Sequence, residues 1–188
     1  MSEPDVTLTD FALAVLCAGF AVALLAAAPL FAGLFAALAL AALLGALWHG
    51  WFSGQSGGRG GALWLGTMLA VGAANLFLWL IAADLIPGLR GPLRAVAFGQ
   101  FALYAAAAMF LTRSFLLPSA FSLPPTLAVL AGFALTANGL GVAGLALALG
   151  AAGLQAAKVG APRLGLTHNG LYHIIQGAAF SLVFAAAL

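Results

Sequence analysis

The residues of this chain that could do chemistry gather in the stretch THNGLYHIIQG, residues 167–177, which contains two of the three histidines. His168 and His173 lie in this stretch, whereas His49 lies far away in the sequence, near the end of another apolar run. Neutral imidazole is the commonest metal ligand, and a catalytic zinc ion takes three protein ligands and a water molecule. We therefore expect His49, His168 and His173 to form a metal site, with zinc as the ion.

Helical geometry constrains this site. Residues five apart are separated by roughly 140° around a helix, so His168 and His173 do not share a face. Asn169, His173 and Gln176 do form one stripe, and Asn169 and Gln176 are therefore expected to support the site or to contact a ligand. We expect His168 to lie in an irregular segment before the first helical turn, with Thr167 as the N-cap.

Each histidine also has a purely structural interpretation. His49 lies between two tryptophans and could bond lipid headgroups. His168 could cap a helix at the water boundary. His173 lies deeper and could bond a neighbouring helix, since an unpaired polar ring is costly there.

Three further polar residues are candidates for the same site or for packing. Asp10 is the candidate catalytic residue, as a carboxylate that orients a histidine or activates water. The alternative for Asp10 is a capping box in TLTD, residues 7–10. Tyr104 is expected to line the cavity of the histidines. Asn75 lies in the middle of an apolar run and is expected to bond a neighbouring helix.

The composition determines which elements must position these residues. The chain is 65% hydrophobic and 5% charged, and its mean hydropathy of +1.17 is far too high for a soluble domain. The six basic residues are scattered, which excludes a nucleic-acid-binding surface. The single cysteine, Cys17, excludes an intrachain disulfide. We predict an all-α integral membrane protein.

Seven apolar runs are long enough to cross a bilayer, which takes about 20 residues in a helix. The glycine-rich segment 53–61 is expected to be a flexible loop. The chain is thus predicted to be a single seven-transmembrane-helix domain, residues 1–188. The predicted spans are 6–28, 29–52, 62–86, 93–111, 115–137, 142–157 and 168–188.

The number of spans determines which residues share an end of the bundle. With seven, all three histidines and several other polar residues fall at one end. These residues are Asp10, His49, Thr67, Gln155, His168, Asn169 and His173.

Basic residues near span ends indicate the orientation. The loops at the end with the histidines carry four basic residues, and the opposite end carries Arg90 and Arg94, one of which is expected to pair with Asp84. The excess favours an N-terminus inside. We expect the membrane to be a bacterial cytoplasmic (inner) membrane. The four residues are Arg59, Arg113, Lys158 and Arg163.

The seven-span layout, the histidine near the end of the second span and the HNGLYH stretch resemble a superfamily of seven-helix membrane hydrolases. It includes alkaline ceramidases, adiponectin-type receptors and Per1 lipid-remodelling proteins. The resemblance implies a zinc ion held by one histidine of helix 2 and an H-x3-H pair of helix 7, and attack of water on a lipid amide. The stretch THNGLYHIIQ also resembles the last helix of a bacterial membrane-protein family of unknown function.

The match to the superfamily is partial. His49 matches the ligand of helix 2, and His173 matches the second histidine of the helix 7 pair. Asn169 stands at the first position of that pair, with His168 one residue before it. Gly45 stands where the superfamily has a serine. Its aspartate has no matching position, and Asp10 is assigned to that role from topology alone.

Two functions are consistent with these residues. The first is zinc-dependent hydrolysis of an amide or ester in a membrane lipid. The alternative is a non-enzymatic sensor of a lipid or small molecule, in which the histidines respond to pH or hold a structural metal ion. A transporter or proton conductor is disfavoured because buried ionisable residues are confined to one end.

Overall fold

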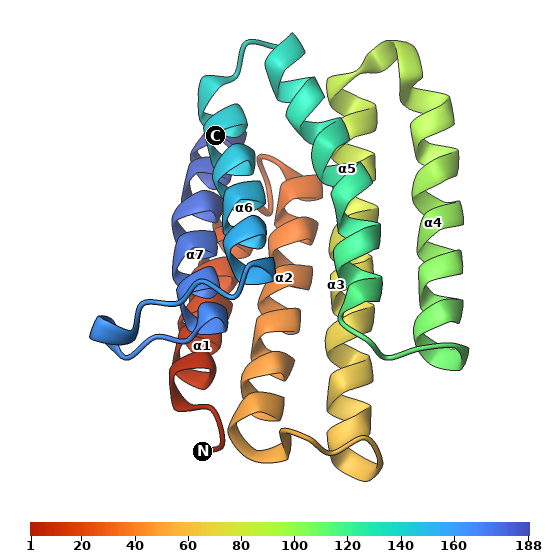
Figure 1. The fold of residues 1–188 in the computed structure, drawn as a ribbon. Helices are drawn as coiled ribbons and strands as arrows, with labels where there is room; N and C mark the ends of the chain where they lie inside the picture. Colours follow the sequence, from red (N-terminus) through yellow and green to blue (C-terminus); the bar gives the residue numbers. More distant parts are fainter.

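The computed structural model describes residues 1–188 and consists of seven α-helices (Figure 1). Each is long and apolar enough to cross a membrane, which confirms the predicted number of apolar helices. A short π-helical segment, Trp48–Phe52, continues α2. The helices are α1 (Pro4–Leu24), α2 (Pro29–Leu47), α3 (Gly58–Leu85), α4 (Arg90–Phe110), α5 (Leu116–Leu135), α6 (Gly139–Ala156) and α7 (His168–Ala187).

The start of α3 corrects one prediction. The helix begins at Gly58, inside the segment expected to be a flexible loop. The helix packs back on the preceding turn so closely that a Cβ at Gly60 would lie 2.6 Å from Gln55 Cβ. The absence of side chains at these glycines therefore allows a tight packing that composition alone does not reveal.

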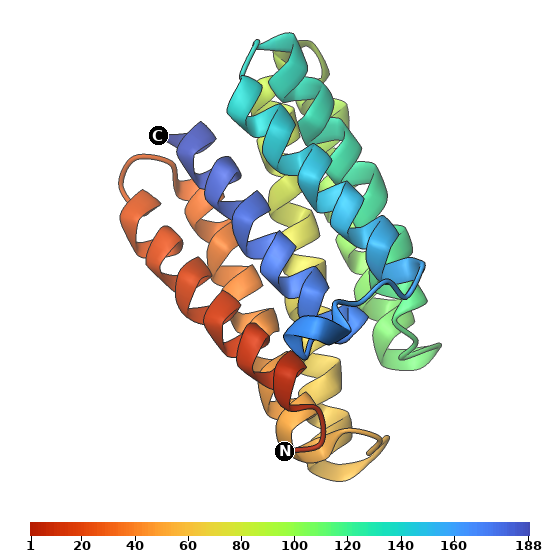
Figure 2. The ribbon, with the colours of Figure 1, turned by 60° about the vertical axis from the view of Figure 1, so that its left-hand side comes forward.

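The helices pack around a core to which α1, α2, α3, α5, α6 and α7 contribute. Figure 2 shows α7 lying between α1 and α6, and this places the histidine-bearing end of α7 against the start of α1. The fourth helix stands outside this core and packs on α3 through a small cluster of Met68, Tyr104 and Ala108. Cys17 is fully buried in the main core, as expected for a structural cysteine.

The proline pair of α5 lies within the helix. Pro125 has no N–H, so it leaves the carbonyl of Phe121 without its helical partner. Gln100 of α4 donates its Nε2–H to that carbonyl at 2.8 Å, and its Oε1 accepts from Trp79 Nε1 of α3 at 2.8 Å. The side chain of Gln100 thus links α3, α4 and α5 and supplies a hydrogen bond to the carbonyl that Pro125 leaves unpaired.

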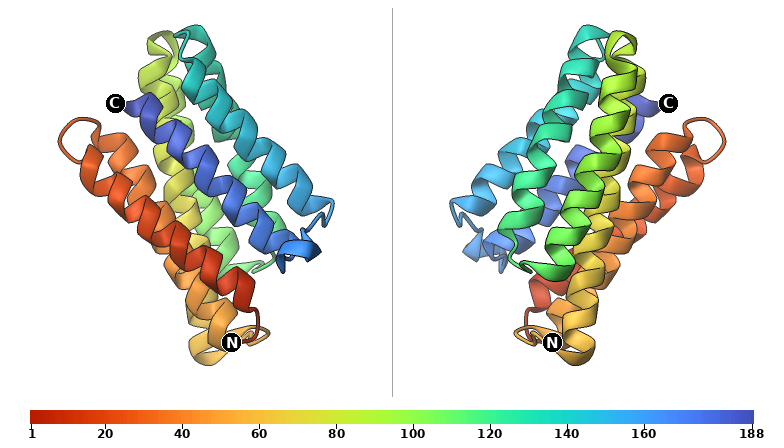
Figure 3. Two further views of the ribbon diagram at one scale, coloured as in Figure 1. Left: turned by 90° about the vertical axis from the view of Figure 1, so that its left-hand side faces the viewer. Right: turned by 90° about the vertical axis from the view of Figure 1, so that its right-hand side faces the viewer.

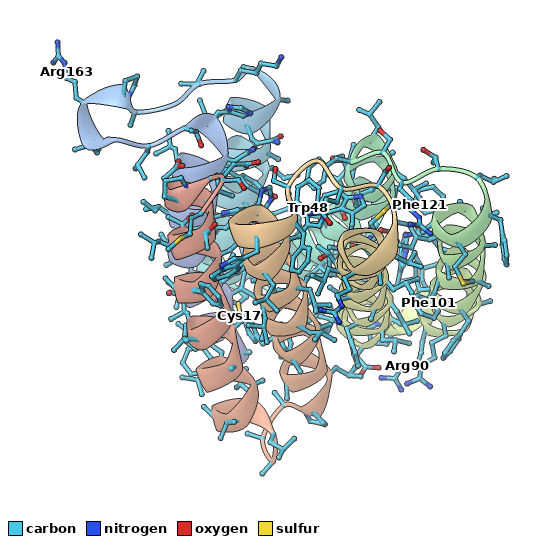
Figure 4. All side chains as sticks on the ribbon, turned by 90° about the horizontal axis from the view of Figure 1, so that it is seen from below. Cys17, Trp48, Arg90, Phe101, Phe121 and Arg163 are labelled. Atoms are coloured by element: carbon cyan, nitrogen blue, oxygen red, sulfur yellow. The ribbon has the colours of Figure 1, made fainter.

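The N-terminus and the α2–α3, α4–α5 and α6–α7 loops lie at one end of the bundle, and the C-terminus lies toward the other (Figures 1 and 3). Arg163 extends outward in the α6–α7 loop (Figure 4). At the opposite end Asp84 lies 3.5 Å from both Arg90 and Arg94, which confirms the predicted pairing.

Candidate functional site

A cavity of about 340 Å³ opens at the end of the bundle that carries the N-terminus; Figure 4 looks onto this end. We call it the polar chamber. The residues that sequence analysis placed at one end of the bundle all line it, so that the predicted shared face is confirmed. They are Asp10, His49, Thr67, Gln155, His168, Asn169 and His173.

His173 lies between two side chains of α1. Its Nδ1 is 3.2 Å from Thr9 Oγ1, and its Nε2 is 3.4 Å from Asp10 Oδ1. The exposed fractions of the two side chains are 13% for His173 and 7% for Asp10. Both ring nitrogens are therefore engaged by α1.

The partners of Thr9 fix the tautomer of this ring. The Thr9 hydroxyl donates its single hydrogen to the backbone carbonyl of Asp5 at 2.8 Å, so toward His173 it can only accept. Nδ1 of His173 consequently carries a hydrogen. Nε2 faces the Asp10 carboxyl group, and the contact is attractive when a proton lies between the two. The two groups lie 3.4 Å apart at the wall of the chamber, and a proton can pass between them when they approach more closely.

His49 is held by a residue that sequence analysis did not single out. Its Nδ1–H donates to Glu3 Oε2 at 2.8 Å, and Ser53 donates its hydroxyl to Glu3 Oε1 at 2.6 Å. The Nε2 of His49 is left as the free ring nitrogen. Glu3 comes just before α1 in a short acidic segment, and only the fold shows that this segment crosses to the end of α2.

Asp5 ties the start of α1 to the start of α7. Thr167 donates its backbone N–H and its hydroxyl to Asp5 Oδ2, each at 2.8 Å. A Cβ at Gly170 would lie 2.6 Å from the same oxygen, so this position must be glycine for the contact to form. Together with Glu3, Asp5 makes the N-terminal segment a bridge between α2 and α7.

The start of α7 confirms one expectation and corrects another. Thr167 is the N-cap, and its hydroxyl oxygen accepts from the N–H of Gly170 at 3.2 Å. His168 is the first residue of the helix rather than part of an irregular segment before it. Asn169 accepts from Gln155 Nε2 of α6 at 3.2 Å, which joins the two helices beside the chamber.

Asp10 is not a capping residue, because α1 begins six residues earlier at Pro4. Its carboxylate lies against the backbone of α2, where a Cβ at Gly45 would stand 3.1 Å from Asp10 Oδ2. Gly45 is the position that corresponds to a serine in the hydrolase superfamily resembled by the sequence. In this chain the Asp10 carboxylate lies at the edge of the space that such a side chain would need.

Two predicted contacts are wrong. Tyr104 does not line this cavity, nor does it line the second cavity of the molecule. Its hydroxyl donates to the carbonyl of Met68 at 2.9 Å, inside the contact between α3 and α4. Asn75 is buried but makes no helix-to-helix hydrogen bond, since its Nδ2 has no partner. The neighbours of Tyr104 and Asn75 depend on how each helix is rotated about its axis. A helix that is apolar on all sides does not reveal this rotation in its sequence.

The residues do not form a metal site as arranged. No group of three or more His, Cys, Asp or Glu side chains is placed to hold an ion. At His173, Thr9 lies 3.2 Å from Nδ1 and Asp10 lies 3.4 Å from Nε2. His173 would have to release one of these partners in order to bind zinc, and zinc binding stays a prediction.

A second cavity of about 300 Å³, which we call the apolar chamber, lies among α2, α3, α5, α6 and α7. It is lined mainly by apolar side chains, with Asn75 and three hydroxyl residues of α5 among them. Several residues line both chambers, so the two spaces adjoin. The shared residues are Leu38, Val71, Phe115, Gln155, Tyr172, Gln176 and Phe180.

Fold and site together define an all-helical, seven-helix protein with a polar chamber at one end and an apolar chamber beside it. The chain belongs to the family of unknown function DUF6962, whose model matches residues 6–188. No curated protein and no solved structure matches it.

Proposed function

We propose that the chain is an integral membrane protein of a bacterial cytoplasmic membrane, with its N-terminus inside. Seven apolar helices and the excess of basic residues in the loops at the N-terminal end support this. Cys17 is the only cysteine, so Cys17→Ala gives a cysteine-free background. In intact cells, an impermeant maleimide should label Gly91→Cys but not Ser56→Cys. The reverse pattern would place the N-terminus outside.

We further propose that the two chambers bind one membrane lipid or a similar amphipathic molecule. The observation that carries this proposal is that two chambers adjoin: one lined by three histidines and the carboxylate of Asp10, and one lined mainly by apolar side chains. A lipid would place its polar head near His173 and its acyl chain in the apolar chamber. Such pockets, apolar with a few convergent polar groups, are typical ligand sites.

Filling the apolar chamber tests this proposal. Ala148 of α6 is half-buried and lines the chamber, so Ala148→Phe should displace the acyl chain. Ala146→Phe is the matched control, because this exposed residue of the same helix lines neither chamber. Mass spectrometry of the purified proteins should find a bound lipid in the wild type and the control, and little in Ala148→Phe. Equal lipid content in all three would contradict the proposal.

Hydrolysis of a lipid amide or ester is the second candidate function. The Asp10–His173 pair favours it, because it places a carboxyl group 3.4 Å from an imidazole at the chamber wall. The pair would take a proton from a water molecule as the water oxygen bonds to the carbonyl carbon. It would return that proton to the nitrogen or oxygen that leaves. General acid–base groups of this kind contribute roughly 10²–10⁴-fold to a rate.

Two measurements separate hydrolysis from binding alone. Asp10→Asn should retain the bound lipid and lower turnover of lipid amides or esters by about 100-fold. Turnover that is unchanged in this variant would exclude the role of Asp10. Metal analysis of the wild type beside His173→Ala tests the zinc prediction separately. About one zinc per chain, lost in the variant, would show that His173 exchanges a protein partner for the ion.

A further inference from the structure

The apolar chamber contains a buried hydrogen-bond donor that the protein does not use. Two buried side-chain nitrogens lack a partner, Trp48 Nε1 and Asn75 Nδ2. Trp48 lines neither chamber, whereas Asn75 lines the apolar chamber and is only 4% exposed. The amide of Asn75 is therefore a donor at the wall of a cavity, in surroundings where an unpaired amide is costly.

Three hydroxyl side chains of α5 also line the apolar chamber, and none of them accepts from Asn75. Ser119 and Thr126 donate within α5, to the carbonyls of Phe115 at 2.9 Å and Ser122 at 2.8 Å. Because no group of the protein accepts from Asn75 Nδ2, an acceptor for it has to come from a molecule that occupies the chamber.

The depth of Asn75 indicates which part of a ligand would reach it. Asn75 comes eight residues after Thr67 in α3, which is about 12 Å along the helix axis. Thr67 lines the polar chamber with the histidines. A molecule with its head in the polar chamber would thus bring the interior of its chain, and not its head, to Asn75.

We propose that the apolar chamber selects lipids that carry a hydrogen-bond acceptor within the acyl chain, a hydroxyl or keto oxygen, and that Asn75 donates to this acceptor. This inference rests on the proposed function that the chambers bind a lipid. The inference adds that the acceptor must lie at a fixed distance from the polar head of the lipid. An unsubstituted saturated chain would leave the amide of Asn75 unpaired.

A positional series of ligands tests the proposal. The full-length protein is loaded with a fluorescent fatty acid, which is then displaced by stearic acid or by monohydroxystearic acids with the hydroxyl at successive positions. In the wild type, one hydroxyl position should bind about tenfold more tightly than stearic acid, the effect of one hydrogen bond. In Asn75→Leu this preference should disappear, while binding of stearic acid is retained.

Two controls keep the test specific. Thr126→Val removes a hydroxyl of the same chamber that already has a partner, so it should keep the positional preference. If Asn75→Leu does not fold, Asn75→Ala removes the same amide with a smaller side chain and should also abolish the positional preference. Equal affinity for every acid in the wild type, or a preference that survives both Asn75 variants, would overturn the inference. Failure of every acid to displace the probe would instead refute the proposed function.

Discussion

The two chambers satisfy their polar groups in opposite ways. In the polar chamber, side chains from the start of α1 reach the histidines, so that His173 and His49 each have a carboxylate partner. In the apolar chamber, Asn75 has no partner for its buried Nδ2. The comparison teaches that the protein itself pairs the histidines of the polar chamber, whereas it leaves a buried donor of the apolar chamber unpaired.

The strongest test of the polar chamber removes one member of its buried pair. His173→Leu should lower the free energy of unfolding by about 3 kcal/mol, because it leaves the Asp10 carboxylate buried without its partner. The double variant Asp10→Leu with His173→Leu should recover most of this loss. SDS titration of the purified proteins measures both. Additive losses in the double variant would show that the two residues are not coupled.

The bridge from α1 to α7 predicts a smaller effect at a glycine. Gly170→Ala should lower the free energy of unfolding by about 2 kcal/mol, since its Cβ would displace Asp5 from Thr167. Gly150→Ala is the matched control. Its Cβ meets nothing within 4 Å, and it should stabilise α6 by up to about 1 kcal/mol. Thermal unfolding distinguishes the two, and equal shifts would contradict the proposed role of Gly170.

Two asparagines, Asn75, which is buried, and Asn138, which is half-buried, should respond with opposite signs. Asn75→Leu should raise the free energy of unfolding of the ligand-free protein by about 1 kcal/mol, because it removes an unpaired amide. Asn138→Leu should lower it by about 1 kcal/mol, because Asn138 caps α6 and donates to the carbonyl of Ala186. Destabilisation by Asn75→Leu in delipidated protein would mean that Asn75 has a partner within the chain.

The smallest effect is expected at Glu3. Its side chain is 34% exposed, so solvent weakens its attraction for His49. Glu3→Gln should lower the free energy of unfolding by less than about 1 kcal/mol. A loss as large as that of Gly170→Ala would show that the bridge to α2 matters as much as the bridge to α7.

Apolar runs, together with the Pro, Asn and Gly residues between them, were enough to predict the helices and the end of the bundle at which the polar residues meet. Each apolar run became one helix, and the parity of seven brought His49 and His173 to one cavity although they are far apart in the chain. This works because span length and chain direction follow from composition. They do not depend on how each helix is rotated.

The rotation of each helix about its axis and the hydrogen-bond partners of the side chains could not be predicted from the sequence. Tyr104 and Asn75 are both polar residues in apolar helices, yet one bonds a neighbouring helix and the other does not. The sequence does not indicate the roles of Glu3 and Asp5, because their partners in α2 and α7 come from distant parts of the chain. Small residues throughout the helices provide too weak a hydrophobic pattern to define which face turns inward.

The contact between Asp5 and Thr167 also has a consequence for biosynthesis. The two residues are separated by 162 positions, which a ribosome takes roughly 10–30 s to translate. In the proposed membrane location, the first six helices enter the bilayer during that interval, while the polar chamber still lacks the wall that α7 supplies. On the proposal that the chambers bind a lipid, a lipid of the surrounding leaflet can occupy the space before the last helix docks, and the protein would then be assembled around it.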